Sequence, residues 1–85
     1  MAQSSAPEKT YMTPQNANEI AVRIQDGEFF FAGMLKRTSG NKFMAQDEQV
    51  RVMYDKDTSQ VVVINVVTGT EFYNYIFSTA DEGSL

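Results

Sequence analysis

Hydrophobic and polar residues alternate along most of the chain, and the alternation predicts β-strands. Ile20, Val22 and Ile24 are separated by single small or polar residues, which is the period of a strand that buries one face. The dipeptide Asp26-Gly27 follows directly, and it supplies the positive φ angles of a tight hairpin turn. The chain is therefore predicted to return after Gly27 as an antiparallel strand.

The same pattern continues toward the carboxyl end, interrupted by clusters of turn residues. Further strands are predicted over residues 28–36, 42–46, 49–54, 60–67 and 70–78. Their connections are short, so strands adjacent in sequence are expected to pair. The sequence predicts an all-β fold: a single antiparallel meander of five to six strands, closed as a small barrel or as a two-layer sheet.

The segment Gln60–Val67 reads QVVVINVV and is apolar on both of its predicted faces. Val61 and Val63 would point to one side, and Val62 and Ile64 to the other. Exposing such a side chain to water forfeits roughly 1.5–3 kcal/mol relative to burial. Both faces are therefore expected to be covered, the second one by barrel closure, by the N-terminal arm or by another copy of the chain.

The two ends of the chain differ in composition from the middle. Residues 1–18 have only Tyr11 and Met12 as large apolar groups, so they are predicted to form a flexible N-terminal arm. These two residues are also the ones that could anchor the arm onto the barrel or a neighbouring subunit. Residues 79–85 are predicted to be a flexible acidic tail, which leaves one antiparallel β domain over residues 19–78.

The amino-acid composition excludes several classes of function but points directly to none. The 85 residues include no histidine and no cysteine, which excludes disulfides, a thiolate nucleophile, an imidazole base and the zinc sites built from those ligands. The protein is therefore predicted not to be an enzyme and to need no cofactor or metal. No secretory leader and no apolar run of about 18 residues is present, so a cytoplasmic protein that does not enter membranes is expected.

The leading functional hypothesis is a small protein-binding or assembly module that acts through a sheet surface. Aromatic residues contribute much of the energy of protein interfaces, so the row Tyr73, Tyr75 and Phe77 is the first candidate contact, with Val62 and Ile64. Under this hypothesis the protein is an accessory or inhibitory component that forms a homo-oligomer or binds another protein. Phages encode small proteins of this type, and the comparison with them is an analogy only. The other interpretation of the same row is that it forms the domain's own core.

A second hypothesis is a barrel that binds single-stranded nucleic acid. Lys36, Arg37 and Lys42 bracket a predicted turn, and Phe30 belongs to a neighbouring run of phenylalanines. Cations interleaved with aromatic rings hold single strands by tracking phosphates and stacking bases. The net charge of −4 acts against a polyanionic partner, and the plainer interpretation is a core of phenylalanines beside an exposed cationic loop.

A third hypothesis is an acidic mimic that occupies the nucleic-acid groove of another protein. Its candidate residues are Asp47, Glu48, Asp55 and Asp57. They belong to the acidic half of the domain: residues 47–78 carry five carboxylates against two cations, whereas residues 19–46 carry three against four. Such an asymmetry suits head-to-tail self-association or a basic partner.

Two segments resemble parts of known families. The stretch from Ile20 to Gly27, with Phe31 and Gly33 after it, is similar to the opening of an Sm-like barrel, although its two glycines are one residue further apart and the second signature strand is missing. The stretch from Val52 to Glu71 resembles the hairpin of small flagellar accessory proteins of the FlaG type, without their helices. Neither resemblance assigns a site residue.

Overall fold

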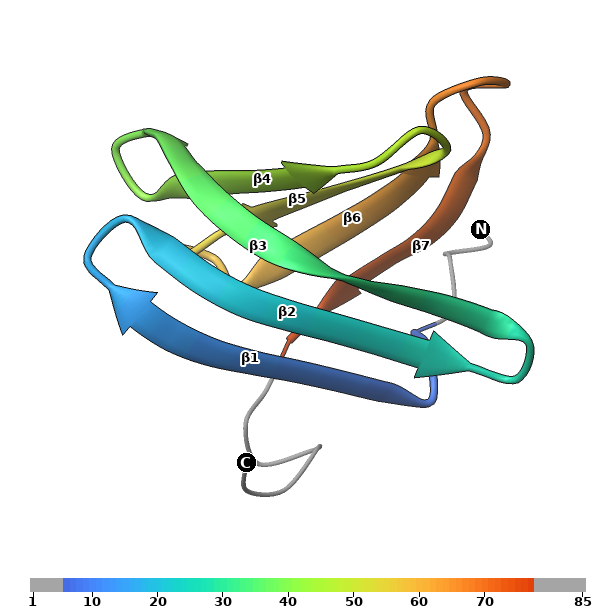
Figure 1. Ribbon diagram of the computed structural model, residues 1–85, viewed down its shortest axis with the longest axis horizontal. Coiled ribbons are helices and arrows are strands. Elements are labelled where there is room, and N and C mark those ends of the chain that lie inside the picture. The colour runs from blue at the N-terminus through green and yellow to red at the C-terminus, as the bar shows by residue number, and fades with distance from the viewer. Residues whose placement is uncertain (1–5, 78–85) are drawn as a thin grey trace.

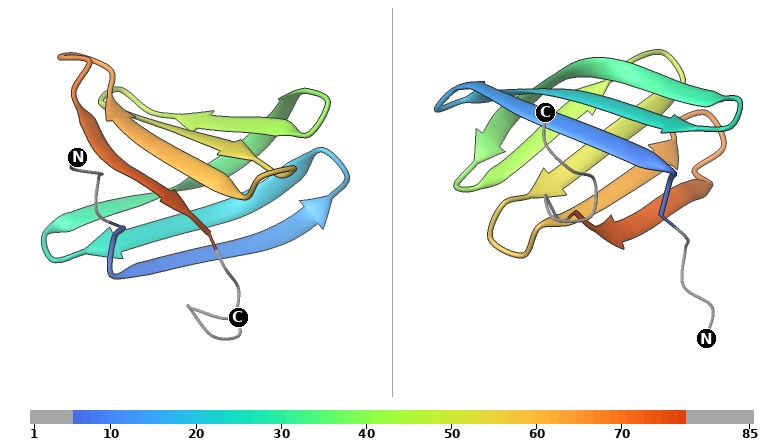
Figure 2. Two further views of the ribbon diagram at one scale, coloured as in Figure 1. Left: turned by 180° about the vertical axis from the view of Figure 1, so that it is seen from behind. Right: turned by 90° about the horizontal axis from the view of Figure 1, so that it is seen from below.

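The computed structural model describes residues 6–77, which form seven β-strands (Figure 1). The strands are β1 (Lys9–Asn16), β2 (Glu19–Asp26), β3 (Phe29–Ser39), β4 (Lys42–Gln46), β5 (Val50–Asp55), β6 (Gln60–Asn65) and β7 (Glu71–Ile76). Each strand pairs with its neighbours in sequence, and every pairing is antiparallel. The sheet curls into a half-barrel (Figures 1 and 2), so the predicted all-β antiparallel meander is confirmed.

Glycines at the predicted reversals allow the tight turns. Gly27 has a φ of 61° and Gly69 a φ of 79°, in the left-handed region that side chains with a Cβ disfavour. The turn at Asp26-Gly27 joins β2 to β3 as the sequence predicts, and the turn around Gly69 joins β6 to β7.

The prediction that residues 1–18 form a flexible arm was wrong for Lys9–Asn16, which form β1. In register with β2, Thr10 lies opposite Ile24 and Met12 opposite Val22, and both Thr10 and Met12 are buried. β1 is an edge strand, where half of the residues face solvent and a proline such as Pro14 is tolerated. Its polar composition therefore hid the strand, and the sheet has seven strands instead of five to six. Residues 1–5 and the predicted acidic tail at 79–85 lie outside the described residues.

The core fills the concave face of the half-barrel. The side chains with the least exposure come from β2, β3, β5 and β6, and they are Ile24, Leu35, Val52, Val61 and Val63. They alternate along their strands with residues that point to the convex face, as a period of two requires. The curl of the sheet thus gives a single core without a second layer.

The expected cover over the second face of β6 is not present within residues 6–77. Val62 and Ile64 lie on the convex face, where each is half-buried. Val62 is opposite Met53 on β5, and Ile64 is opposite Arg51, so long side chains of the neighbouring strand flank them. Side chains of the neighbouring strand thus shield Val62 and Ile64 in part, whereas the apolar pattern of β6 predicts a separate covering layer.

Side chains join the two edges of the sheet along a line that we call the seam. No backbone ladder between β1 and β7 occurs in the described part of the chain. Instead, Thr10 Oγ1 and the Tyr75 hydroxyl share a hydrogen bond of 2.6 Å across the gap. The half-barrel is therefore closed on this side by side-chain contacts alone.

Candidate functional site

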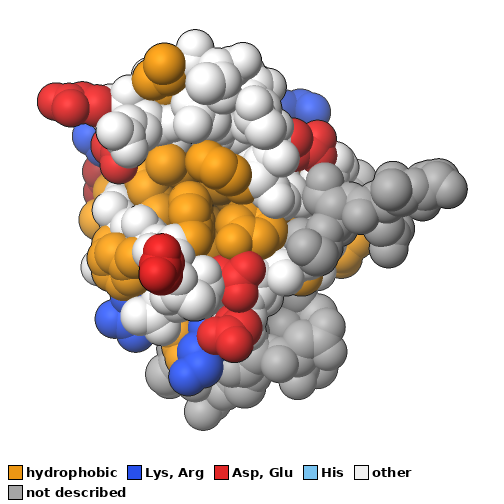
Figure 3. All heavy atoms as spheres, turned by 90° about the vertical axis from the view of Figure 1, so that its right-hand side faces the viewer, with side chains coloured by type: hydrophobic (Ala, Val, Ile, Leu, Met, Phe, Trp, Pro, Cys, Tyr) orange, Lys and Arg blue, Asp and Glu red, His pale blue; other side chains and the backbone are white. Residues whose placement is uncertain are grey.

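The meander gathers alternate turns at one end of the half-barrel. Successive reversals of an antiparallel meander lie at opposite ends, so the β2–β3, β4–β5 and β6–β7 turns share one end, on the right in Figure 1. We call this end the mouth. Figure 3 faces it and shows hydrophobic side chains gathered at the centre with carboxylate side chains around them.

Three aromatic rings, Phe29, Phe72 and Tyr73, form the floor of the mouth. The ring centroids of Phe29 and Phe72 are 5.3 Å apart, and those of Phe29 and Tyr73 are 5.4 Å apart in an edge-to-face arrangement. Such geometries are the preferred ones for aromatic pairs. The contacts join the start of β3 to the start of β7, which makes the floor a fixed surface built by distant parts of the chain.

A β-bulge turns Phe72 toward the mouth. Tyr73 is opposite Val63 and Glu71 is opposite Ile64, so Phe72 has no partner of its own on β6. An extra residue of this kind breaks the strict alternation and redirects a side chain. Phe72 consequently contacts its neighbour Tyr73, with ring centroids 6.5 Å apart, although simple alternation predicts opposite faces.

The Tyr73 hydroxyl fixes the floor to the β2–β3 turn. It donates a hydrogen bond of 2.7 Å to Asp26 Oδ2. The pKa of Tyr73 is raised from 10.0 to about 12, chiefly by burial and further by the hydrogen bond to Asp26 and the negative charges of Asp26 and Tyr75. The neutral phenol is therefore the favoured state of Tyr73 in the folded protein.

This shift predicts a late tyrosine titration. Because the folded-state pKa of Tyr73 is raised, its contribution to stability is complete below pH 10 and is lost as the pH rises from 10 toward about 12. An ultraviolet absorbance titration should include a step near pH 12 from Tyr73. Burial raises the pKa of Tyr54 as well, so the Tyr73 step is identified by comparison with variants. This step should vanish in Tyr73→Phe and move to lower pH in Asp26→Asn. A titration near pH 12 that is identical in wild type and Tyr73→Phe would contradict the assignment.

Carboxylates surround the aromatic floor and form the acidic rim. The rim consists of the following residues of the three turns and of the adjacent strand starts: Glu8, Asp26, Glu28, Asp47, Glu48 and Glu71. Lys9 and Arg51 are the cations at the starts of β1 and β5, which lie at the same end. The six carboxylates outnumber these two cations, so the mouth is negatively charged.

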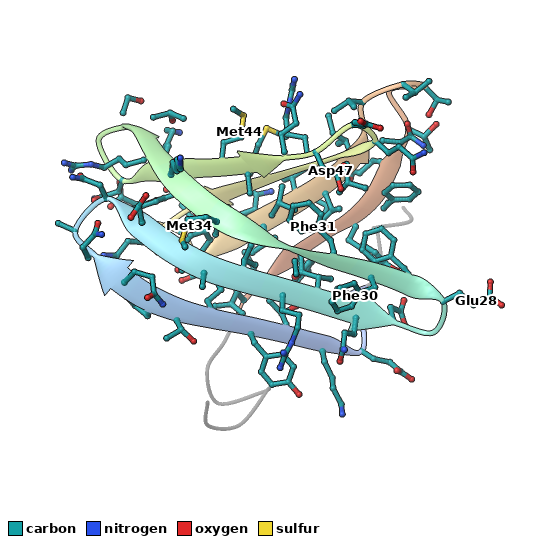
Figure 4. The ribbon with its side chains drawn as sticks, viewed as in Figure 1. Glu28, Phe30, Phe31, Met34, Met44 and Asp47 are labelled. Atoms are coloured by element: carbon teal, nitrogen blue, oxygen red, sulfur yellow. The ribbon has the colours of Figure 1, made fainter. Side chains whose placement is uncertain are left out.

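The rim carboxylates do not all have the same role. Asp47 Oδ1 accepts hydrogen bonds from the backbone N–H groups of Gln49 (2.8 Å) and Val50 (2.7 Å), and it therefore shapes the β4–β5 turn. Glu28 and Glu48 are exposed, and neither side chain makes a hydrogen bond or ion pair with residues 6–77. Figure 4 shows Glu28 at the tip of its turn and Asp47 on a different turn of the same end. Glu28 and Glu48 are thus available to an incoming group.

The charge difference between the two halves of the sequence does not correspond to two faces of the folded domain. The predicted mimic set is divided: Asp47 and Glu48 are at the mouth, whereas Asp55 and Asp57 are at the opposite end. There Asp55 accepts from Lys42 Nζ at 3.4 Å, and Asp57 accepts from Asn41 at 2.7 Å. The four carboxylates of the mimic hypothesis therefore do not form one surface.

The residues of the nucleic-acid hypothesis are also separated. Lys36, Arg37 and Lys42 lie near the β3–β4 turn, whereas Phe30 is at the other end of β3, opposite Gln25. Phe30 and Lys36 are six positions apart along the strand, which corresponds to roughly 20 Å. Phe30 stands 57% exposed on the convex face near the mouth (Figure 4), without a cation cluster beside it.

The predicted contact row of β7 faces inward. Tyr73, Tyr75 and Phe77 are half-buried and pack against the core, which agrees with the alternative interpretation of that row as the domain's own core. Val62 and Ile64 are on the opposite, convex face, so the five predicted contact residues do not share a surface. Of the five predicted contact residues, only Tyr73 lies in the mouth, and Phe29 and Phe72 are not among the five.

Several hollows occur elsewhere in the described part of the chain, and two of them are mainly apolar. One is an apolar groove of about 310 Å³ on the convex face, lined by Met44, Met53 and Val62 among others. The other, of about 210 Å³, opens at the end opposite the mouth and is lined by Ile20, Tyr54 and other core residues. Neither has an acidic rim comparable to that of the mouth.

Residues 6–77 contain no group of three or more potential metal-ligating side chains placed to hold an ion. The same residues include no helix of the length and apolarity needed to span a membrane. Comparisons with protein-family models, with curated proteins and with solved structures each give no match. The function of this chain must therefore be inferred from the geometry of the mouth.

Proposed function

We propose that this chain is a small non-enzymatic protein-binding module whose contact surface is the mouth. The observation that carries the proposal is the partly exposed aromatic floor inside a ring of carboxylates. Phe72 is 36% exposed, and Val67 in the adjoining β6–β7 turn is 73% exposed. Apolar groups left in water at one end of a small domain, inside a polar rim, are typical of protein interaction sites.

The construction of the mouth also suits a binding surface. The rings of Phe29 and Tyr73 are held by mutual contact, and Asp26 holds the Tyr73 hydroxyl. A surface that is ordered before binding loses little conformational entropy when a partner arrives. A buried aromatic cluster at the centre with polar groups at the edge is the usual anatomy of an interface hot spot.

Affinity capture with matched variants tests this proposal. Wild type, Phe72→Asp and Ile76→Asp are used as baits in lysate from the source cells, after circular dichroism shows that each is folded. Ile76 is on the same strand and is 61% exposed, but it points to the convex face away from the mouth. Proteins captured by wild type should be retained by Ile76→Asp and lost with Phe72→Asp.

A second mouth variant protects the test against a folding defect. Val67→Asp changes an exposed turn residue and should also weaken capture of the same proteins. If both Phe72→Asp and Val67→Asp retain the proteins, or if Ile76→Asp loses them equally, the mouth is not the contact surface.

A further inference from the structure

We infer that the mouth recognises a cationic peptide segment that carries a large apolar anchor residue. This inference rests on the proposed function and specifies the chemistry of the partner. The acidic rim supplies the charge selectivity, and the aromatic floor supplies the apolar surface that the anchor contacts. Each part corresponds to a distinct and separately testable feature of the mouth.

The rim favours a positively charged occupant. Glu28 and Glu48 come from two turns on different strands and are exposed, and neither is neutralised by a neighbouring cation of the described chain. Opposite charges around an apolar centre orient a partner and accelerate its encounter. Lysine or arginine side chains on a peptide would face this rim, whereas the phosphates of a nucleic acid would be repelled by it.

The floor favours an apolar anchor beside the cations. The ring of Phe72 is the exposed part of the floor, and Phe29 and Tyr73 surround it. Burying a leucine or aromatic side chain against these rings removes apolar surface of both partners from water. Lysine and arginine also interact favourably with ring faces, so cations and anchor can be close together in the partner.

A second copy of this chain fits the mouth less well. A symmetric, mouth-to-mouth dimer would bring two acidic rims together, which like charges disfavour. A head-to-tail contact would offer the end that holds Lys36, Arg37, Lys42 and Lys56, but Glu19, Asp55 and Asp57 at that end leave an excess of only one positive charge. The charge complementarity therefore favours a separate cationic segment.

Peptide titration tests the inference directly. The probe is a synthetic peptide with two lysines on each side of a Leu-Trp-Leu centre, added to the full chain at low salt. One comparison peptide has glutamates in place of the lysines, and the other has serines in place of the apolar centre. Only the first should bind, it should shift the amide NMR signals of Phe29, Phe72 and Tyr73, and its affinity should fall as salt is added.

Charge-reversal variants with equal net charge provide the control. Glu28→Lys/Glu48→Lys alters the rim, and Glu19→Lys/Asp57→Lys makes the same change in net charge at the opposite end. Two reversed rim charges should weaken the lysine peptide by about tenfold or more, whereas the control pair should change its affinity by less than about twofold. Both variants change exposed or half-exposed positions, so the fold should tolerate them.

Three outcomes would overturn the inference. The first is equal binding of the glutamate peptide or no binding of the lysine peptide, and the second is equal weakening by both double variants. The third is that light scattering shows a dimer for wild type and a monomer for Glu28→Lys/Glu48→Lys, since the mouth would then bind a second copy of this chain. In the first two cases, capture that depends on Phe72 would still support the proposed function, so the two failures are distinguishable.

Discussion

Leu35→Ala is expected to lower the free energy of unfolding by about 2–5 kcal/mol. Leu35 is 0% exposed, faces the concave side of β3 and is opposite Ile20 of β2. Truncation removes buried methyl groups and leaves a cavity. The surrounding strands cannot move in to fill it, because β3 is paired with β2 on one side and β4 on the other. Small domains are stable by only about 5–15 kcal/mol in total, so this variant should be close to unfolding at physiological temperature.

Urea unfolding followed by circular dichroism measures the effect. The matched control is Met34→Ala at the adjacent position, where the side chain is 38% exposed and points to the convex face. Its cost should be below about 1 kcal/mol, because little apolar surface returns to water. Equal losses in both variants would mean that the concave face is not the core.

Tyr75→Phe is expected to cost about 1–3 kcal/mol, because it removes the partner of a buried hydroxyl. Thr10 is buried on β1, and its Oγ1 atom lies 2.6 Å from the Tyr75 hydroxyl across the seam. Without the tyrosine hydroxyl, the threonine hydroxyl loses this hydrogen bond in an environment with little access to water. The loss should therefore exceed the value of an exposed hydrogen bond.

A double-mutant cycle isolates this contact. The single variants Tyr75→Phe and Thr10→Val are compared with the double variant by urea unfolding, and the double should lose about 1 kcal/mol less than the two singles combined. Thr13→Val changes an exposed threonine of the same strand, and it should alter stability by less than about 0.5 kcal/mol. Strict additivity of Thr10→Val and Tyr75→Phe would show that the seam contact contributes nothing.

The sequence predicts most strands because their chemistry is local. Alternation at Ile20, Val22 and Ile24 marks a half-buried strand, and Gly27 marks the turn that comes after it. The valine-rich strand β6 is equally clear, since β-branched residues are poorly suited to helices. These features need no knowledge of distant contacts, which explains why the meander could be predicted.

The features that the sequence does not predict depend on contacts between residues that are far apart in the chain. β1 is stabilised by its pairing with β2 and by the burial of Met12, which a mostly polar segment does not reveal. The position of Phe72 depends on a bulge, and alternation predicts the wrong face for it. The acidic rim can be predicted from the sequence, because a meander places alternate turns together, whereas the charge of each half of the chain does not reveal it.

The sequential strand order also has a consequence for how the chain folds. Each ladder joins neighbouring segments, so only short loops must close before backbone pairing begins, and low contact order favours fast folding for an all-β protein. The hydrogen bond between Thr10 and Tyr75, by contrast, joins positions 65 residues apart. Such a contact is expected to form after the barrier is crossed, so it would slow unfolding and leave the folding rate nearly unchanged.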